Sequence, residues 1–269
     1  MFNPIGVKMK KLFPLLGLII LFTTSLSSCN TASRNTADSV TLTKEERKVS
    51  DFQGVDLQTS GDIILTQSTT ESVFVETDTD LLPNIETVVE NGILILRTTN
   101  GKSIQPSNGI KFYITIQNPS QLVISGTGNI SADTLGAGDL EINITGTGNV
   151  KVGTLTVKSL NLSINNGYLS INDLTAGPLS VNITGTGNST LNGGHVEQQT
   201  VNIPGSGVYA ASGLISENAV VTIDGTGRAE VWANQTLKVD IKGSGTVLYS
   251  GNPSLSLSLT GTGQVQQKK

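Results

Sequence analysis

Acidic and basic residues gather near the C-terminal end of the chain in a combination that polysaccharide-cleaving enzymes use. Asp224, Glu230 and Asp240 fall at positions predicted to face outward, and Arg228 and Lys242 lie near them. Glycoside hydrolases need two carboxyl groups about 5 to 9.5 Å apart, and residues two strands apart in a sheet are separated by about 10 Å. A polysaccharide lyase or hydrolase is therefore one alternative function that these residues leave open.

A second candidate is a ligand-binding cluster around Trp232, the only tryptophan in the chain. Ala229 and Val231 occupy the inward positions of an apolar–polar alternation, which places Trp232 on the outside. An exposed indole beside Arg228 and Glu230 is suited to stacking on a sugar or docking a partner. Packing of the ring against a neighbouring loop is the structural alternative.

Three asparagines, Asn129, Asn149 and Asn188, occupy the same position after a repeated glycine triplet. Asparagine side chains bond to nearby backbone in turns, and stacked copies bond to one another. The pattern therefore favours a structural ladder, and a sugar-binding asparagine row is the functional alternative. Calcium-binding glycine-rich repeats carry an aspartate in their motif instead, so we expect no calcium ladder.

The sequence contains too few histidine and cysteine residues to support other kinds of catalysis. His195 is the only histidine and Cys29 the only cysteine, whereas zinc requires several converging ligands. His195 falls in an apparent loop, Asn192-Gly193-Gly194-His195, and no nucleophile elbow accompanies it. We therefore predict a protein that is not an enzyme and holds no metal and no cofactor.

The positions of all these residues depend on a repeat of about 20 residues in the second half of the chain. A fixed short period is typical of stacked coils that bury their apolar side only against their neighbours. The repeated glycines are expected to supply left-handed or cramped corner conformations. A worn copy of the triplet stands at Asn165-Asn166-Gly167, and the first glycines of the Gly-Thr-Gly or Gly-Ser-Gly triplets are Gly126, Gly146, Gly185, Gly205, Gly225, Gly243 and Gly261.

Each repeat is predicted to contain three short strands. In the unit Leu140–Val157, apolar and polar residues alternate on both sides of the triplet that starts at Gly146. An isoleucine stands two residues before nearly every triplet, as at Ile144 and Ile183, so stacked coils would build one aliphatic core. We therefore predict an all-β fold, a single-stranded parallel β-helix or solenoid. An antiparallel sandwich or a propeller is the alternative, because two units match one propeller blade in length.

The N-terminus is typical of a targeting signal. A basic segment at Lys8–Lys11 precedes an apolar run that is too short to span a bilayer, and Leu26-Ser27-Ser28-Cys29 follows. Small residues before a cysteine resemble the lipobox of bacterial lipoproteins. This resemblance implies a signal peptide over residues 1–28 and a lipid on Cys29, which would anchor the chain to a membrane.

The rest of the chain before the repeats divides into two parts. Residues 29–50 are rich in Ser, Thr, Ala and Asn and are predicted to form a flexible tether. Residues 51–120 are predicted to form an N-terminal β region with the first coils, and a capping hairpin turns at Glu90-Asn91-Gly92. We expect this region to form one domain with the glycine-cornered repeats of residues 121–269.

Charge and composition narrow the range of partners. Loss of the signal peptide would leave 14 basic and 21 acidic residues, with no basic cluster, which argues against a nucleic-acid partner. Only 14% of the chain is charged and 4% is aromatic. That composition suits an extended β structure with small polar residues better than an enzyme with a deep pocket.

The repeated blocks also carry a family resemblance. Ser-Gly-Thr-Gly-Asn and Thr-Gly-Thr-Gly-Asn recur in order, Asp51-Phe52-Gln53-Gly54-Val55 precedes them, and Tyr249-Ser250-Gly251-Asn252-Pro253 follows. Together they resemble the "putative auto-transporter adhesin, head GIN domain" family of Bacteroidetes lipoproteins, over about Asp51 to Gln266. The resemblance implies a right-handed β-helix and a cell-envelope location.

The function expected from these features is a lipid-anchored envelope scaffold, at the outer membrane, that binds polysaccharide or protein. Its periplasmic or surface orientation stays open, as does assembly into a small homo-oligomer. A self-assembling structural component is a further alternative, because an uncovered terminal coil can pair with another chain. The candidate ligand-binding residues are Trp232, Arg228, Glu230, Asn129, Asn149 and Asn188.

Overall fold

The computed structural model describes residues 41–268, which belong to one compact unit. The expected signal peptide, Cys29 and residues 30–40 of the expected tether lie outside the described residues. Among the residues that are described, no helix is long and apolar enough to cross a membrane.

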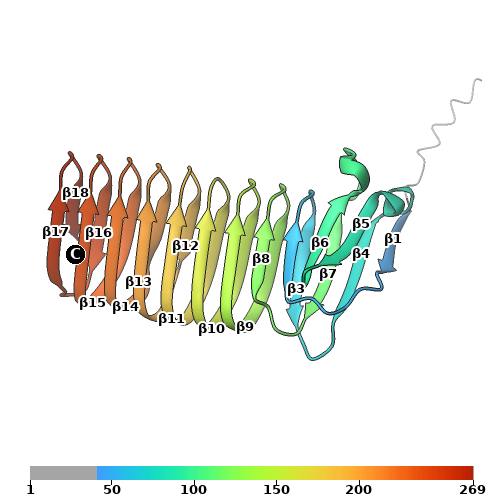
Figure 1. The fold of residues 1–269 in the computed structure, drawn as a ribbon, viewed down its shortest axis with the longest axis horizontal. Helices are drawn as coiled ribbons and strands as arrows, with labels where there is room; N and C mark the ends of the chain where they lie inside the picture. The colour runs from blue at the N-terminus through green and yellow to red at the C-terminus, as the bar shows by residue number, and fades with distance from the viewer. Residues whose placement is uncertain (1–40, 269) are drawn as a thin grey trace, which may run out of the picture. The chain divides into compact units, whose positions relative to one another are not determined.

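Parallel coils make up most of the described chain, and each coil pairs with the next along one continuous sheet (Figure 1). This confirms the predicted all-β parallel solenoid. Regular coils contain one long strand, and two of the coils are split into separate strands by a bend. The strands are β9 (Asn129–Ile144), β10 (Asn149–Ile164), β11 (Tyr168–Ile183), β12 (Asn188–Leu191), β13 (Gly194–Ile203), β14 (Val208–Ile223), β15 (Arg228–Ile241), β16 (Thr246–Ser250), β17 (Ser254–Leu259) and β18 (Gln264–Gln267).

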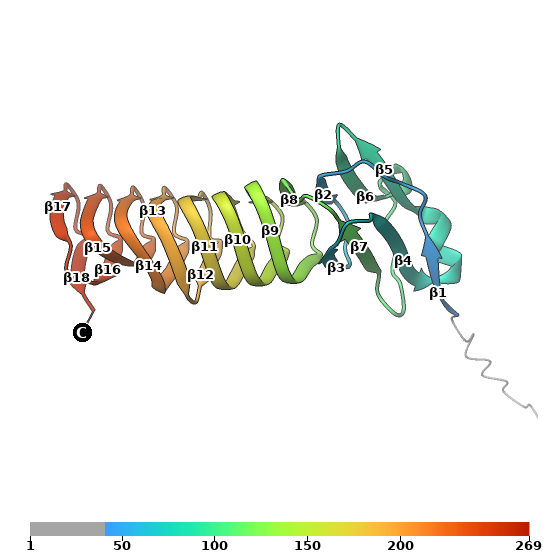
Figure 2. The same ribbon diagram turned by 90° about the horizontal axis from the view of Figure 1, so that it is seen from below.

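Burial divides each long strand into three arms, as the alternation predicts. Along β10 the inward side chains fall in three groups, 150–152, 155–157 and 160–164, and a pair of outward residues separates each group from the next. Two successive outward residues break the period of 2 and mark a corner. We call the arm that follows the glycine triplet, such as residues 149–152, the first arm. Figure 2 shows the coils from a second side.

The glycine triplets turn the remaining corner, and of the two expected reasons for glycine, a left-handed or a cramped conformation, the structure supports the cramped one. None of the triplet glycines has a positive φ, so the expected left-handed conformation is wrong for them. A Cβ on Gly146 would instead overlap the carbonyl oxygen of Gly126 one coil earlier, and one on Gly148 would overlap that of Gly128. Glycine is therefore required because the turns of successive coils stack backbone against backbone.

The first coil in sequence is not the first coil in the stack. β2 (Gly54–Leu57) and β3 (Asp62–Gln67) pair on one side with β6 (Ile93–Thr98) and β7 (Lys111–Ile116). On the other side they pair with β8 (Gln121–Ile124) and β9. The chain therefore inserts its earliest coil between two later ones, and this places β3 in register with β9.

Antiparallel strands cover the N-terminal end of the stack. β1 (Leu42–Glu46) pairs with β4 (Ser72–Asp78), which pairs with β7. The 3₁₀ helix η1 (Thr79–Asn84) leads into β5 (Ile85–Glu90), and η2 (Thr99–Gly101) follows β6. β5 and β6 form the hairpin predicted around Asn91.

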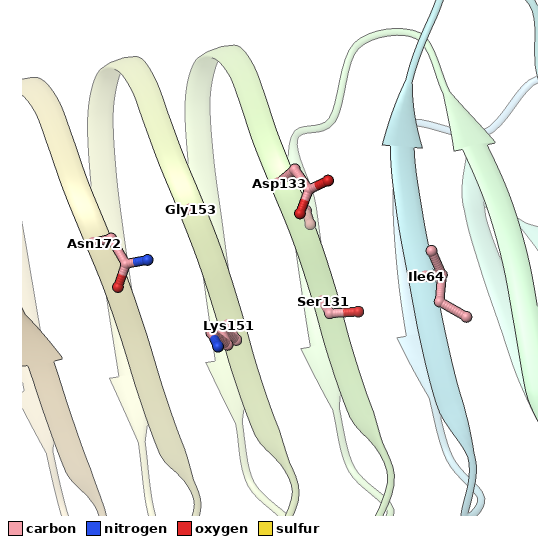
Figure 3. A pocket seen from close by; sticks show the side chains of 7 residues that line it. Ile64, Ser131, Asp133, Lys151, Gly153 and Asn172 are labelled. Atoms are coloured by element: carbon pink, nitrogen blue, oxygen red, sulfur yellow. The ribbon is translucent and has the colours of Figure 1, made fainter.

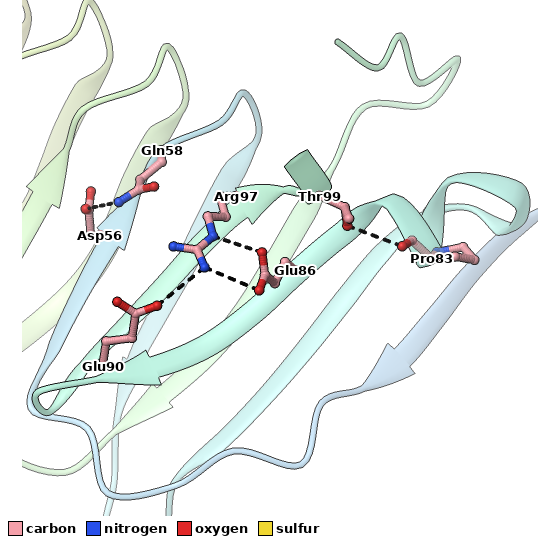
Figure 4. Close-up of polar contacts among 7 residues, drawn as sticks. All are labelled: Asp56, Gln58, Pro83, Glu86, Glu90, Arg97 and Thr99. Atoms are coloured by element: carbon pink, nitrogen blue, oxygen red, sulfur yellow. Dashed lines mark hydrogen bonds and ion pairs between the residues drawn. The ribbon is translucent and has the colours of Figure 1, made fainter. Parts of the chain in front are cut away.

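The outer face of this hairpin carries an ion-pair cluster. The Arg97 guanidinium binds the Glu86 carboxylate at 2.9 Å and lies 3.4 Å from that of Glu90 (Figure 4). The hydrogen bond from Arg97 lowers the pKa of Glu86. Opposite charges across an antiparallel pair favour one register of the hairpin.

The C-terminal end of the described stack is open. Leu255, Leu257 and Leu259 of β17 continue the inward columns of Leu237, Val239 and Ile241. Those three partners are fully buried, whereas the leucines of β17 are 45–47% exposed because no described coil covers them.

Candidate binding face

The first arms together form a continuous face along the stack. The strands of this face pair side by side in the order β1, β4, β7, β3, β9, β10, β11, β12, β14, β15, β16 and β18. Because the coils are in register, the outward side chains form columns with a spacing of about 4.8 Å. We call this surface the first-arm face.

One part of the first-arm face is hollowed. Two adjoining hollows of about 350 and 390 Å³ share Ile64, Ser131 and Lys151. Figure 3 shows the first of them. We call them together the β3–β10 groove. The remaining side chains that line it are those of Asp62, Lys111, Asn129, Ile130, Ala132, Asp133, Asn149 and Asn172, together with Gly153.

The hollow at Gly153 has a simple steric origin. A Cβ at this position would overlap the carbonyl oxygen of Asp133 on the preceding coil, so the corner requires glycine. The absent side chain leaves an opening between Asp133, Lys151 and Asn172 (Figure 3). Ser131 is also short, so the floor of the groove lies below its lysine and asparagine edges.

A hydrogen-bonded ladder forms one wall of the groove. Asn149 donates to the side-chain oxygen of Asn129 at 2.6 Å, and Asn129 donates to the Asp62 carboxylate at 2.7 Å. Tyr168 occupies the next place in this column, between Asn149 and Asn188. The structure therefore brings two of the three predicted asparagines together and separates Asn188 from them by a tyrosine ring that is 40% exposed.

The two lysines of the groove have free ammonium groups. Among residues 41–268, neither Lys111 nor Lys151 forms an ion pair or a side-chain hydrogen bond. Beyond Lys111, the Lys44 ammonium lies 3.6 Å from the centre of the Tyr113 ring and covers it. The groove therefore presents two free ammonium groups, whereas Lys44 already covers the nearby Tyr113 ring.

A separate hollow of about 380 Å³ lies near the C-terminal end of the same face. Half-buried Trp232 lines it together with Ser212, Ser250, Gly251 and Lys268. The indole N–H donates to the Asn234 side-chain oxygen at 3.0 Å. The structure thus places Trp232 on the outward side, with part of its ring packed against neighbouring residues.

Arg228 and Glu230, the other residues of the predicted cluster, form an ion pair beside this hollow. Glu230 binds Arg228 at 2.8 Å and Lys268 at 2.7 Å. The hydrogen bonds from Lys268 and then from Arg228 lower the pKa of Glu230. Its carboxylate therefore stays ionised and is held by two cations, so Glu230 is poorly suited to proton transfer.

The comparisons with known proteins agree with this architecture. Residues 51–168 and 165–253 match the family model described as "Putative auto-transporter adhesin, head GIN domain". The chain belongs to this family. No curated protein matches the chain.

Solved structures of similar proteins share the head GIN domain fold of this chain. A "putative lipid binding protein" from Parabacteroides distasonis is 24% identical with a TM-score of 0.81, and a "putative adhesin" from the same species is 25% identical with a TM-score of 0.79. A "putative adhesin" from Parabacteroides merdae is 23% identical with a TM-score of 0.80. Each alignment covers 86% of this chain and 98% of the other.

The acidic residues considered for catalysis in this head GIN domain lie on neighbouring coils. Asp224 forms an ion pair with Lys242 at 3.2 Å, and Asp240 is paired in register with Thr222. His195 was expected in a loop, but it is an exposed residue of strand β13, because Gly194 already pairs with Leu174 and Leu214. Within the described part of the chain, no three His, Cys, Asp or Glu side chains could hold a metal ion.

Sequence reasoning missed the β3–β10 groove of this head GIN domain. Two signals for it exist in the sequence. Ile64 is an apolar residue at an outward position of its strand, and Tyr168 replaces asparagine in the column after the triplet. Their proximity depends on β3 lying next to β9, which no local pattern indicates.

Proposed function

We propose that this protein is a non-catalytic binding scaffold of the bacterial cell envelope, anchored at the outer membrane by a lipid on Cys29. The observation that carries the proposal is the first-arm face, where outward side chains stand in register over many coils and a groove with free polar groups opens to solvent. A rigid repetitive face of this kind suits an extended ligand. The adhesin names of similar structures are consistent with it.

The ligand class is polysaccharide or protein. The acidic balance of the chain, with 21 acidic and 17 basic residues, works against nucleic acid. The purified full chain in detergent would be tested against a glycan array and used to capture envelope proteins. We expect a saturable ligand of one of these two classes. If neither assay yields one, the binding function is wrong.

The anchor is tested separately, because Cys29 lies outside the described residues. Cells that express the chain would be fed a labelled fatty acid, and we expect label on the wild type and none on Cys29→Ser. Labelling of Cys29→Ser, or equal membrane retention of both forms after lysis, would refute the lipid anchor. Protease treatment of intact cells would then show which side of the outer membrane the protein faces, because a periplasm-facing protein cannot be an adhesin.

Self-assembly is the second candidate function, and the open end at β17 favours it. The alternating segment Ser254–Leu259 contains neither charge nor proline, the residues that usually protect an edge strand. Light scattering would compare the wild type with Leu257→Lys, which places a charge among the exposed leucines. A wild type that stays monomeric at high concentration would rule this candidate out.

A polysaccharide lyase or hydrolase receives less support. Asp224 is paired with Lys242, and Glu230 is held by two cations. Turnover of uronate or neutral glycans that is abolished by Asp224→Ala or Asp240→Ala would reverse this judgement.

A further inference from the structure

The β3–β10 groove offers hydrogen-bond donors and acceptors in balance. Lys111 and Lys151 supply free ammonium groups, and the carboxylates of Asp62 and Asp133 supply acceptors at a net charge of zero. Asn149 gives one amide hydrogen to Asn129 and keeps its carbonyl oxygen and second amide hydrogen available. Paired donors and acceptors of this kind suit a ligand rich in hydroxyl groups, because each hydroxyl both donates and accepts.

Two apolar side chains interrupt these polar groups. Ile64 is 36% exposed on one flank, and Tyr168 is 40% exposed at the other end of the asparagine ladder. An exposed tyrosine presents an apolar ring face together with a polar hydroxyl. A sugar ring has the matching character, with C–H faces and hydroxyl edges, so it could contact the ring face and the polar groups at once.

The spacing of the coils favours a long ligand along the stack. The column of Lys111, Asp62, Asn129, Asn149 and Tyr168 crosses five neighbouring strands. Four strand spacings amount to about 19 Å. One spacing is close to the length of one pyranose residue in an extended chain, so successive sugars would meet successive coils.

Peptide and lipid ligands fit the groove less well. Strands β3, β9 and β10 are paired on both sides along the groove, so they offer no free edge to which a peptide strand could add. An acyl chain needs an enclosed apolar cavity, whereas four charged side chains line this open groove. A net charge of zero also gives the groove no overall attraction for an acidic polymer.

We propose that the β3–β10 groove binds an uncharged glycan chain that runs across β7, β3, β9, β10 and β11. Tyr168 and Ile64 contact the C–H faces of the sugars, and Lys151 with Asp133 binds their hydroxyl groups. This inference rests on the proposed binding function and assigns it a ligand class and a site.

The test uses the purified full chain in detergent and measures affinity by calorimetry. The probes are neutral oligosaccharides of four to six sugars, such as β-glucan, mannan and xylan fragments, and oligouronates of equal length. We expect at least one neutral probe to bind, with an affinity that changes by less than about twofold between low and high salt, because no ligand charge is screened. Tyr168→Ala and Lys151→Ala should each weaken binding about tenfold or more.

Matched controls separate this site from the rest of the protein. Lys158→Ala removes another exposed lysine of β10 outside the groove, and Trp232→Ala removes the indole that lines the second hollow on the same face. Both should leave the glycan affinity unchanged, and all four variants should still unfold cooperatively, because none of the substituted residues belongs to the buried core.

Four results would overturn the proposal. Neutral binding that is lost in Trp232→Ala and kept in Tyr168→Ala would move the glycan site to the C-terminal hollow. Salt-sensitive binding of oligouronates alone would make the ligand acidic. Capture of a protein partner without glycan binding would refute the glycan groove while the proposed scaffold function stands, and the absence of any ligand would refute both.

Discussion

The Tyr209 hydroxyl donates a hydrogen bond of 2.9 Å to the Gln199 side-chain oxygen, and both side chains are fully buried inside the solenoid. The Gln199 amide donates to Ser216 at 2.9 Å and to the main-chain oxygen of Trp232 at 3.0 Å. Ser216 also donates to that oxygen at 2.6 Å. Burial raises the pKa of Tyr209, so its hydroxyl remains a donor.

This network lies where the coil becomes shorter. Tyr209 pairs with Ala229, 20 residues later, whereas Val221 pairs with Val239, 18 residues later, and the register shifts between these points. Two buried side chains supply hydrogen bonds to the Trp232 carbonyl beside this shift. A buried carbonyl without partners would cost about 1–3 kcal/mol. We infer that this buried hydrogen-bonded network accommodates the change in coil length within a mostly apolar core.

Gln199→Leu should destabilise the protein by about 1–3 kcal/mol, although leucine occupies this column in most coils. The reason is that the Tyr209 hydroxyl loses its acceptor and the Trp232 carbonyl loses a donor. Urea unfolding would measure the change, with exposed Gln198→Leu as the control. Adding Tyr209→Phe to Gln199→Leu should recover part of the loss, because it removes the hydroxyl that is left without an acceptor. If Gln199→Leu is as stable as the wild type, the network contributes little to the free energy of unfolding.

Gly146→Ala should destabilise the solenoid by about 2 kcal/mol or more, because the new methyl group would overlap the carbonyl oxygen of Gly126. Gly138→Ala is the matched control, since an added Cβ there meets no atom within 4 Å. Thermal unfolding of the two variants should give a lower melting temperature for the first alone. Equal melting temperatures would show that the turns do not need close backbone contact.

An inward leucine should contribute more to the stability of the protein where further coils cover it than at the open C-terminal end. Leu162→Ala removes a side chain that is 3% exposed and should cost about 2–5 kcal/mol. Leu257→Ala removes an inward leucine that is 47% exposed, and it should cost less than about 1.5 kcal/mol. Chemical denaturation at low protein concentration would compare them. A large cost for Leu257→Ala in the monomer would show that another group covers β17.

The ion pairs of Glu230 should add stability at neutral pH that disappears in acid. Lys268 and Arg228 lower the pKa of this carboxyl in the folded chain. Its contribution is therefore present above the unfolded-state pKa and is lost as the pH falls through the lowered folded-state value. The difference in unfolding free energy between the wild type and Glu230→Gln should shrink between pH 7 and about pH 3. A constant difference over this range would contradict the assigned ion pairs.

Much of the architecture follows from the sequence, because a solenoid encodes its coils locally. Ile144, Ile183 and Ile203 stack as one buried column, as their place before the triplets predicts. The hairpin around Asn91 also follows from an alternating pattern interrupted by a turn signal. In both cases a period of 2 and a short turn lie within one stretch of chain, where the pattern is complete.

Only the tertiary structure decided how distant segments meet. Gly54 lies beside both Ile93 and Gln121, so the earliest coil separates two later ones and brings Ile64 next to Ser131. The reason for the triplet glycines likewise depends on a neighbouring coil, because the Cβ they lack would overlap the backbone of that coil. Alternation determines which side of a strand is buried, whereas pairing across long loops depends on the combined packing of all the coils. The β3–β10 groove is a product of that pairing.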